Sequence, residues 1–493
     1  MTGRRLYIVT FAMMLSLFLA SIEATVVATA MPTIVAQLGG LDIYAWVFSA
    51  YMLTSTTTLP IFGKLSDIYG RRRIYLLAVT LFMIGSALCA HAQSMPQLVL
   101  FRALQGIGAG GILPLAFTII GDIFTFEQRA KMQGLFSGVW GVSSLVGPLV
   151  GGFLVDYVSW HWVFYLNVPF GLVGMGLMLA AWREVTPRTG GRVDYLGAAL
   201  LSGGIIALML ALFEMRAGAQ LSWFSLGLAL AAALGLLLAL GFVERRAANP
   251  ILPLALFRGR LFASAVGHGF FAGFALFGST AFVPLFAQAV LGTSATMAGA
   301  VLTPQMFSWT LASIIGTRLL LRFHFRALAM VGMTMLFLGL AMLTQVAVTT
   351  PSWILATSMA LTGVGMGLSI PTFLIAVQST VPRQLLGTAT SMVQFGRSIG
   401  GAIGTSVMGV VLTLRLSAGL VAAGFDPARI SVDALLDANL GVSAAMTSAL
   451  RAALTGAMQA VFVIALVAAV GAWLAVAFAP HVRIGEQASA PTD

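Results

Sequence analysis

The sequence predicts an all-α polytopic membrane protein with fourteen transmembrane helices. Of its 493 residues, 59% are hydrophobic and only 8% are charged, whereas charged residues make up about 25% of a soluble domain. Most Lys and Arg fall in one set of loops, and this positive-inside pattern predicts that both termini lie in the cytoplasm. The net charge of +11 therefore reports topology, and we expect no nucleic-acid partner.

A spanning helix needs about 20 mostly apolar residues, and this rule gives two sets of six spans with an extra pair between them. The first set is expected near 6–30, 44–63, 74–92, 97–121, 130–155 and 161–182. The extra pair is expected near 194–214 and 222–243, and the second set near 261–287, 296–321, 327–348, 352–378, 386–414 and 452–478.

The predicted domains follow from this division. They are an N-terminal six-helix half (1–190), a two-helix insertion with its linker (191–250) and a C-terminal six-helix half (251–493). The last includes a mildly polar external loop, 415–451, in which Asp433 is suited to cap a short helix. A partial lid and a simple spacer both remain open as roles for that loop.

The two halves are expected to be structural repeats. Glycines 106, 108 and 110 align with glycines 363, 365 and 367 at an offset of 257 residues, which also pairs Pro114 with Pro371 and Gly147 with Gly404. Duplicated halves are typical of secondary transporters, whose substrate sites lie near the midplane between the repeats. Channels and membrane enzymes also contain repeats, so this feature favours a transporter but does not exclude those two classes.

Glu23 lies deep in the first expected span, among Phe18, Ile22 and Val26. It is the only carboxylate expected at such a depth, and intramembrane acids usually mark an ion or proton pathway. A low dielectric disfavours the ionised form, so such a group can exchange a proton near neutral pH. The sequence predicts Glu23 as a proton carrier, and a purely structural salt bridge to an arginine is the alternative.

The stretch GKLSDIYGRRR occupies residues 63–73, between the second and third expected spans. Gly70 permits a tight turn, and Asp67 with the arginines forms a charged cluster. This pattern resembles the signature loop of the major facilitator superfamily. The resemblance implies that Asp67 and Arg71, joined by Asp122 at the end of the fourth span, stabilise a gate on the cytoplasmic side.

Arg102 lies within the fourth span, three residues before a Gln-Gly pair, as in the helix-four motif of that family. An arginine keeps its charge and needs an acceptor inside a membrane, and Glu23 is the nearest available type. Movement of Arg102 relative to Glu23 would change the proton affinity of that carboxylate between states. We therefore expect the two residues to act together in proton coupling.

The fifth span contains GVSSLVGPLVGG at 141–152. Small residues allow tight helix contact, and a proline removes a backbone hydrogen bond. In the family that the chain resembles, a Gly-Pro-x-x-Gly-Gly pattern at this place is associated with antiporters, and here it comprises Gly147, Pro148, Gly151 and Gly152.

Two further stretches resemble the fourteen-helix drug:proton antiporter branch of that family. They are SIEATVVATAMP at 21–32, with Glu23 where Asp is usual, and WHWVFYLNVPFG at 160–171, with His161 where Arg is usual. Together with the insertion pair, the resemblance covers nearly the whole chain. It implies a major-facilitator-like fold, alternating access and a place in the plasma membrane, which is the inner membrane of a prokaryote.

Five residues on spans expected to line a cavity are candidates for cargo binding: Trp140, Gln305, Trp309, Gln394 and Arg397. A wide apolar cavity with few polar groups suits hydrophobic molecules, cationic ones included. The sequence shows no phosphate-binding Gly-rich loop, metal-ligand cluster or nucleophile–base pair. We therefore expect no enzyme, and no cofactor apart from protons as the coupling ion.

These features together predict a proton-coupled multidrug efflux antiporter that exports hydrophobic or cationic amphipathic compounds. An exporter of lipids or amphipathic metabolites would use the same fold. A receptor or scaffold that does not transport would keep the fold and lack proton coupling. The expected partners are a small hydrophobic molecule and the lipid bilayer, and a monomer is the simplest expectation.

Overall fold

The computed structural model describes residues 3–39, 43–184, 193–216, 222–293, 295–426 and 444–481. The first set of helices comprises α1 (Gly3–Leu38), α2 (Tyr44–Tyr69), α3 (Arg71–Ala90), α4 (Met95–Ile123), α5 (Phe126–Tyr157), α6 (His161–Tyr165) and α7 (Asn167–Ala181). The extra pair is α8 (Tyr195–Arg216) and α9 (Trp223–Glu244), followed by the short α10 (Leu254–Phe257).

The second set begins with α11 (Arg260–Leu285), which continues as a π-helical turn, η3 (Phe286–Val290). It continues with α12 (Ala295–Ala300), α13 (Thr303–Leu319), α14 (Phe325–Leu343), α15 (Ser352–Thr380), the turn η4 (Arg383–Leu385), α16 (Leu386–Ala422) and α18 (Ala444–Phe478). All regular structure in the described residues is helical, as a bilayer requires of a chain that must satisfy its backbone polar groups internally.

Eleven helices in the described part of the chain are long and apolar enough to cross a membrane. The expected spans near 44–63, 130–155 and 296–321 coincide with α2, α5 and the α12–α13 pair, which are not among the eleven. The all-helical membrane fold is therefore confirmed, and the number of fourteen spans stays a prediction.

Two expected spans are broken, and a proline explains each break. Pro169 has no N–H to donate to the carbonyl of Tyr165, where α6 ends, and Pro304 has none for Ala300, where α12 ends. Because proline removes the hydrogen bond to the residue four positions earlier, the helix restarts in both places. The single helix predicted over 296–321 was wrong in this respect. The helix predicted over 161–182 is interrupted at one turn, but His161–Ala181 is still long and apolar enough to form one membrane span.

The predicted external loop, 415–451, was too long. Helix α16 continues to Ala422 and α18 already begins at Ala444, because Ala- and Leu-rich helices propagate readily beyond an apolar core. Asp433 lies outside the described residues, so its cap stays a prediction.

The two sets of helices are arranged as repeats. Helices α4 and α15 have bounds that differ by 257 residues at both ends, the offset seen in the glycines. In α4, Gly106 and Gly110 face α2, and Gly108 faces α3; in α15, the three matching glycines face α13 and α14 in the same order. The domain limits at 190 and 251 stay a prediction.

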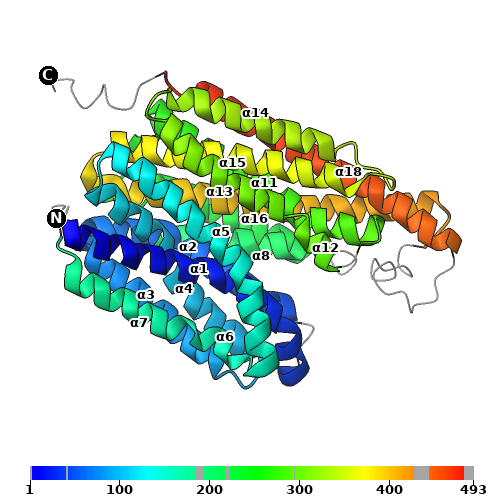
Figure 1. Ribbon diagram of the computed structural model, residues 1–493, viewed down its shortest axis with the longest axis horizontal. Helices are drawn as coiled ribbons and strands as arrows, with labels where there is room; N and C mark the ends of the chain where they lie inside the picture. Colours follow the sequence, from blue (N-terminus) through cyan, green and yellow to red (C-terminus); the bar gives the residue numbers. More distant parts are fainter. Residues whose placement is uncertain are drawn as a thin grey trace.

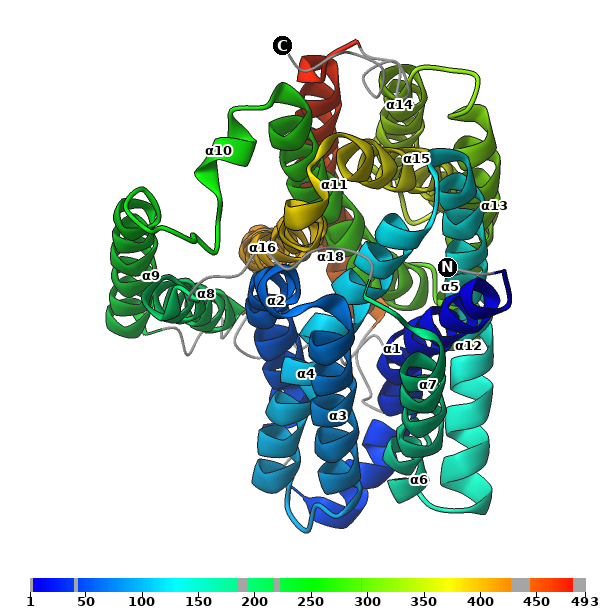
Figure 2. The same ribbon diagram turned by 90° about the vertical axis from the view of Figure 1, so that its left-hand side faces the viewer.

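Figure 2 views the molecule along its helices, with the first set below and the second set above. Each set has its own hydrophobic core, and the sets meet mainly through α2 against α16 and α5 against α13. Helix α1 begins at the left-hand side of Figure 1. The end of the molecule at which α2 ends and α3 begins holds Asp67 and Arg71; it is called the gate end here and is predicted to be cytoplasmic.

The extra pair lies beside α2 and α16, as Figure 2 shows. Helix α8 contacts both, and a small apolar cluster joins Ile205 and Met209 of α8 to Ile68 of α2 and to Ile399 and Ala402 of α16. The insertion therefore covers one of the two seams between the halves.

Candidate functional site

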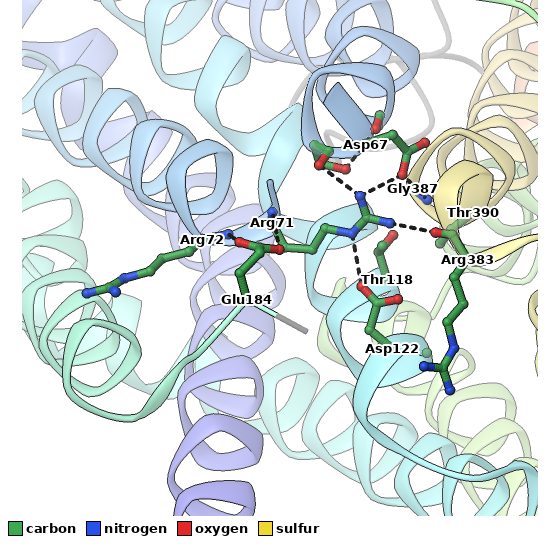
Figure 3. Close-up of polar contacts among 12 residues, drawn as sticks. Asp67, Arg71, Arg72, Thr118, Asp122, Glu184, Arg383, Gly387 and Thr390 are labelled. Atoms are coloured by element: carbon green, nitrogen blue, oxygen red, sulfur yellow. Dashed lines mark hydrogen bonds and ion pairs between the residues drawn. The ribbon is translucent and has the colours of Figure 1, made fainter. Parts of the chain in front are cut away.

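A cluster of buried charges joins the two halves at the gate end (Figure 3). Arg71 at the start of α3 forms ion pairs with Asp67 at 2.7 Å and with Asp122 at 2.9 Å. Its guanidinium also donates to the backbone carbonyl of Arg383 in the second half, at 3.0 Å. The structure thus brings the three predicted gate residues together and adds a contact across the seam.

Asp67 makes a second contact across the seam, at the first turn of α16. Its carboxylate accepts hydrogen bonds from the backbone N–H groups of Gly387 (3.0 Å) and Thr388 (2.7 Å) and from the Thr388 hydroxyl (2.6 Å). A carboxylate is favourable there because the first N–H groups of a helix lack internal partners. Nothing in the 63–73 stretch pointed to α16 as the partner, so sequence reasoning missed it.

Arg129 and Gln378 reinforce the gate end and were also missed. Arg129 donates to the carbonyls of Gly121 and Phe124 and, at 2.9 Å, to that of Gln378 across the seam. Gln378 returns a hydrogen bond of 3.1 Å to the carbonyl of Phe117. An arginine at a cytoplasmic helix end is expected from topology alone, so no signal separated Arg129 from its neighbours.

Glu23 and Arg102 form a buried ion pair inside the first half. Arg102 Nη1 lies 2.5 Å from Glu23 Oε1, and the two residues are 2% and 1% exposed. The guanidinium also stacks over the ring of Tyr51, 4.1 Å from its centroid. The structure therefore places the predicted coupling residues in direct contact.

Two amides complete the binding of the Glu23 carboxylate. Gln105 donates to Oε1 at 3.0 Å, and Asn167 donates to Oε2 at 2.5 Å. Both amides also donate to the Ser86 hydroxyl, which links α3, α4 and α7 to α1. Asn167 is a polar residue in an apolar span, and the argument that selected Glu23 applied to it as well. Sequence reasoning nevertheless did not predict Asn167 as a site residue.

The glycines of α5 place α1, which carries Glu23. A Cβ at Gly147 would lie 1.9 Å from Thr25 Oγ1, and one at Gly151 would lie 2.1 Å from Thr29 Oγ1, whereas a Cβ at Gly152 would meet nothing within 4 Å. Close packing on α1 therefore explains Gly147 and Gly151 but not Gly152. Pro148 lies within α5, and its side chain is outside the described part.

A central cavity of about 290 Å³ lies between the halves. All five predicted cargo-binding residues line it: Trp140, Gln305, Trp309, Gln394 and Arg397. They come from α5, α13 and α16, and α1, α4, α11 and α15 complete the wall. The structure thus brings the five together, and their role in binding stays a prediction.

The cavity is closed at the gate end. Its lining residues Ser137 and Thr310 join α5 to α13, through a 2.6 Å hydrogen bond between Ser137 and Ser313 and a 3.3 Å bond from Thr310 to the Ser137 carbonyl. On the other side, Phe277 and Thr280 are shared with a second hollow of about 620 Å³, which extends along α16 to Gly409. The adjoining hollow therefore lies between α2, α11 and α16, on the side of the cavity away from the gate end.

Known proteins share this sequence pattern and fold. The family described as Major Facilitator Superfamily matches residues 13–405. The "Multidrug transporter protein MdtP" of Bacillus subtilis (strain 168) is 40% identical over 415 residues, covering 84% of this chain and 76% of that protein. The "Efflux pump dotC" of Dothistroma septosporum is 33% identical over 420 residues, covering 82% and 71%.

Two solved structures have the same fold. The human organic anion transporter MFSD10 (TETRAN) aligns with a TM-score of 0.62 at 14% identity, over 95% of this chain and 100% of that chain. The proton:xylose symporter XylE, bound to 6-bromo-6-deoxy-D-glucose, aligns with a TM-score of 0.58 at 14% identity, over 95% of each chain. At these identities the likeness concerns the fold alone.

Proposed function

Because this chain belongs to the Major Facilitator Superfamily, we propose that it is a proton-coupled efflux antiporter that exports hydrophobic amphipathic compounds. Its relatives include proteins named as multidrug transporters and efflux pumps, which supports export of small molecules. We place it in the plasma membrane, with the gate end facing the cytoplasm.

The observation that carries the proposal is the Glu23 carboxylate, 1% exposed and held by one cation and two amides. Protonation would remove the charge that binds Arg102, which retains its own charge. The 2.5 Å ion pair between α1 and α4 would then loosen. Proton occupancy at Glu23 would therefore change how tightly these two helices are held together.

Helix α1 also links the proton site to the cavity, because Ser21 and Thr25 line the cavity while Glu23 between them points into the first half. A displacement of α1 would therefore alter both sites. Because the halves are joined at the gate end, we assign this structure to the outward-facing form of the cycle. Rocking of the halves would give the inward-facing form.

Inward proton flow supplies about 2.3 kcal/mol per charge for each 100 mV. This free energy is sufficient to drive modest accumulation of a cargo outside the cell in each cycle. Deprotonation of Glu23 on the cytoplasmic side and its protonation on the external side would give the cycle its direction.

The test compares wild type with Glu23→Gln in liposomes that contain a pH-sensitive dye. Addition of an amphipathic compound should move protons in the wild type and not in the variant, because glutamine keeps the shape and amide contacts but carries no titratable proton. Glu127→Gln is the matched control, since Glu127 is an exposed carboxylate in the first turn of α5. Equal proton movement in Glu23→Gln and wild type would remove Glu23 from this role.

A further inference from the structure

We infer that the central cavity binds amphipathic compounds that carry an anionic group, such as a carboxylate, and that Arg397 binds this group. The inference rests on the proposed efflux function and specifies the class of its cargo. It differs from the cationic cargo that the apolar character of the sequence left open.

The charge of the cavity lining is the first observation. Among the described residues that line the cavity, Arg397 is a cation and none is Asp or Glu. The ion pairs found in the described ranges join Arg71 to two aspartates and Arg102 to Glu23, so none of them includes Arg397. A guanidinium keeps its charge under accessible conditions, and the cavity wall is therefore positive.

The neighbours of Arg397 do not neutralise it. His268 of α11 interacts electrostatically with Arg397; it is 2% exposed and stacks on Phe373 at a centroid distance of 4.7 Å. A histidine can add positive charge and cannot remove it. Because a charge in a poorly solvated site is costly unless paired, the site favours an anionic partner from outside the chain.

Tight helix packing fixes the position of Arg397. A Cβ at Gly273 of α11 would lie 2.2 Å from the Arg397 carbonyl oxygen, and one at Gly400 of α16 would lie 2.0 Å from the Phe270 carbonyl oxygen. The backbones of α11 and α16 are therefore in contact on both sides of this arginine. The Arg397 side chain therefore extends from a rigid part of the backbone. This favours binding of a planar acid group in one orientation.

The Glu23 carboxylate does not compensate for Arg397. It lies in the same stretch of α1 as the cavity residues Ser21 and Thr25, but it pairs with Arg102 and two amides within the first half. The pair has no net charge while Glu23 is ionised and becomes positive when Glu23 is protonated. The protein around the cavity is thus positive in both protonation states.

The remaining lining fits the apolar part of such a compound. Aromatic rings come from several helices and surround the space: Phe117, Phe136, Trp140, Phe277 and Trp309. Gln394 lies three residues before Arg397 on the same face of α16, where its amide can donate a second hydrogen bond to an acid group. A planar aromatic acid matches both the rings and the polar pair.

The test measures binding to the purified full-length protein in nanodiscs of zwitterionic lipid, by isothermal titration calorimetry at pH 7.5. The probes share one naphthalene body: naphthylacetate, naphthylacetamide and naphthylethylamine, which are anionic, neutral and cationic. Empty nanodiscs correct for partition into lipid. We expect the wild type to bind the anion at least tenfold more tightly than the cation.

Arg397→Gln should weaken binding of the anion about tenfold, which corresponds to about 1.4 kcal/mol. Binding of the neutral amide should stay within twofold, which also shows that the variant is folded. Arg397→Lys should retain most of the preference for the anion, because it keeps the charge. Equal binding of anion and cation to the wild type, or an equal loss of anion and amide in Arg397→Gln, would overturn the inference.

These binding measurements use no proton gradient, so they separate the two proposals. A preference for the anion without cargo-dependent proton movement in liposomes would support the inference and contradict the antiport mechanism. Proton movement driven equally by all three probes, with no binding preference, would support the antiport mechanism and contradict the inference of an anionic cargo.

Discussion

At the scale of single residues, Glu23 and Arg102 belong to a buried hydrogen-bond network inside the first half. The Glu23 carboxylate accepts hydrogen bonds on both oxygens, and Arg102 is shared among Glu23, Gln105 and the Val47 carbonyl. Loss of one member of a buried ion pair leaves the other charge uncompensated. Such a loss typically costs about 3–5 kcal/mol.

We therefore expect Arg102→Met to lower the thermal stability of the purified protein substantially, because the ionised Glu23 would remain in a dry site. Adding Glu23→Gln in the same chain should restore part of that stability, because no unpaired charge would then remain buried at this site. Thermal unfolding of the wild type, both single variants and the double variant completes a mutant cycle. If the two effects simply add, the pair is not energetically coupled.

Sequence reasoning reached this pair because an intramembrane arginine requires an acceptor and Glu23 is the one carboxylate expected at that depth. It did not reach Asn167, whose contact with Glu23 depends on how α7 packs on α1. The sequence also could not predict that Gly152 has no close neighbour. A motif gives the residue type at a position but does not say which neighbouring helix that residue faces.

At the scale of helices, backbone contact between α11 and α16 determines the shape of the cavity wall. This contact depends on Gly400, because the nearest atom to an added Cβ would be the Phe270 carbonyl oxygen, which cannot rotate away. Gly409 lies nine residues further along the same helix, and a Cβ there would meet nothing within 4 Å.

Gly400→Ala should consequently destabilise the protein and impair cargo binding, because α11 and α16 must move apart to accept the methyl group. Gly409→Ala should be neutral or slightly stabilising, since alanine favours helix by about 1 kcal/mol over glycine. Thermal unfolding and cargo binding of both variants provide the comparison. Similar behaviour of the two would show that the α11–α16 crossing tolerates separation.

Helix positions were more predictable than helix ends. The apolar spans follow from composition and length, and the breaks at Tyr165 and Ala300 follow from prolines that sequence reasoning left unused. The extension of α16 to Ala422 was not predictable in this way, because hydropathy marks where a helix meets lipid and not where it ends in water.

At the scale of the whole molecule, the gate end holds the halves together through few but strong contacts. Asp67 binds the start of α16, and Arg71 reaches the Arg383 carbonyl. Both contacts join segments more than 300 residues apart in the chain. The motif around Asp67 predicted a gate, and the folded molecule adds that Asp67 contacts α16.

Asp67→Asn should shift the molecule toward a form that is open at the gate end, because a neutral amide binds the start of α16 more weakly. Spin labels at Tyr69 and Gln384, both exposed, should report a new population at longer distance in pulsed electron resonance. The native Cys89 is buried and can remain in place. Asp156→Asn, at an exposed carboxylate near the end of α5, is the control, and an unchanged distance in Asp67→Asn would contradict this role.

The position of α8 has a consequence for how a membrane-dissolved compound reaches the centre. By repeat symmetry the α2–α16 and α5–α13 seams are equivalent, yet α8 lies across the first of them (Figure 2). An acyl chain or drug that diffuses sideways out of the bilayer therefore meets a helical barrier on one flank. A molecule built from two equal halves has in this way acquired two unlike flanks, one that carries α8 and one that does not.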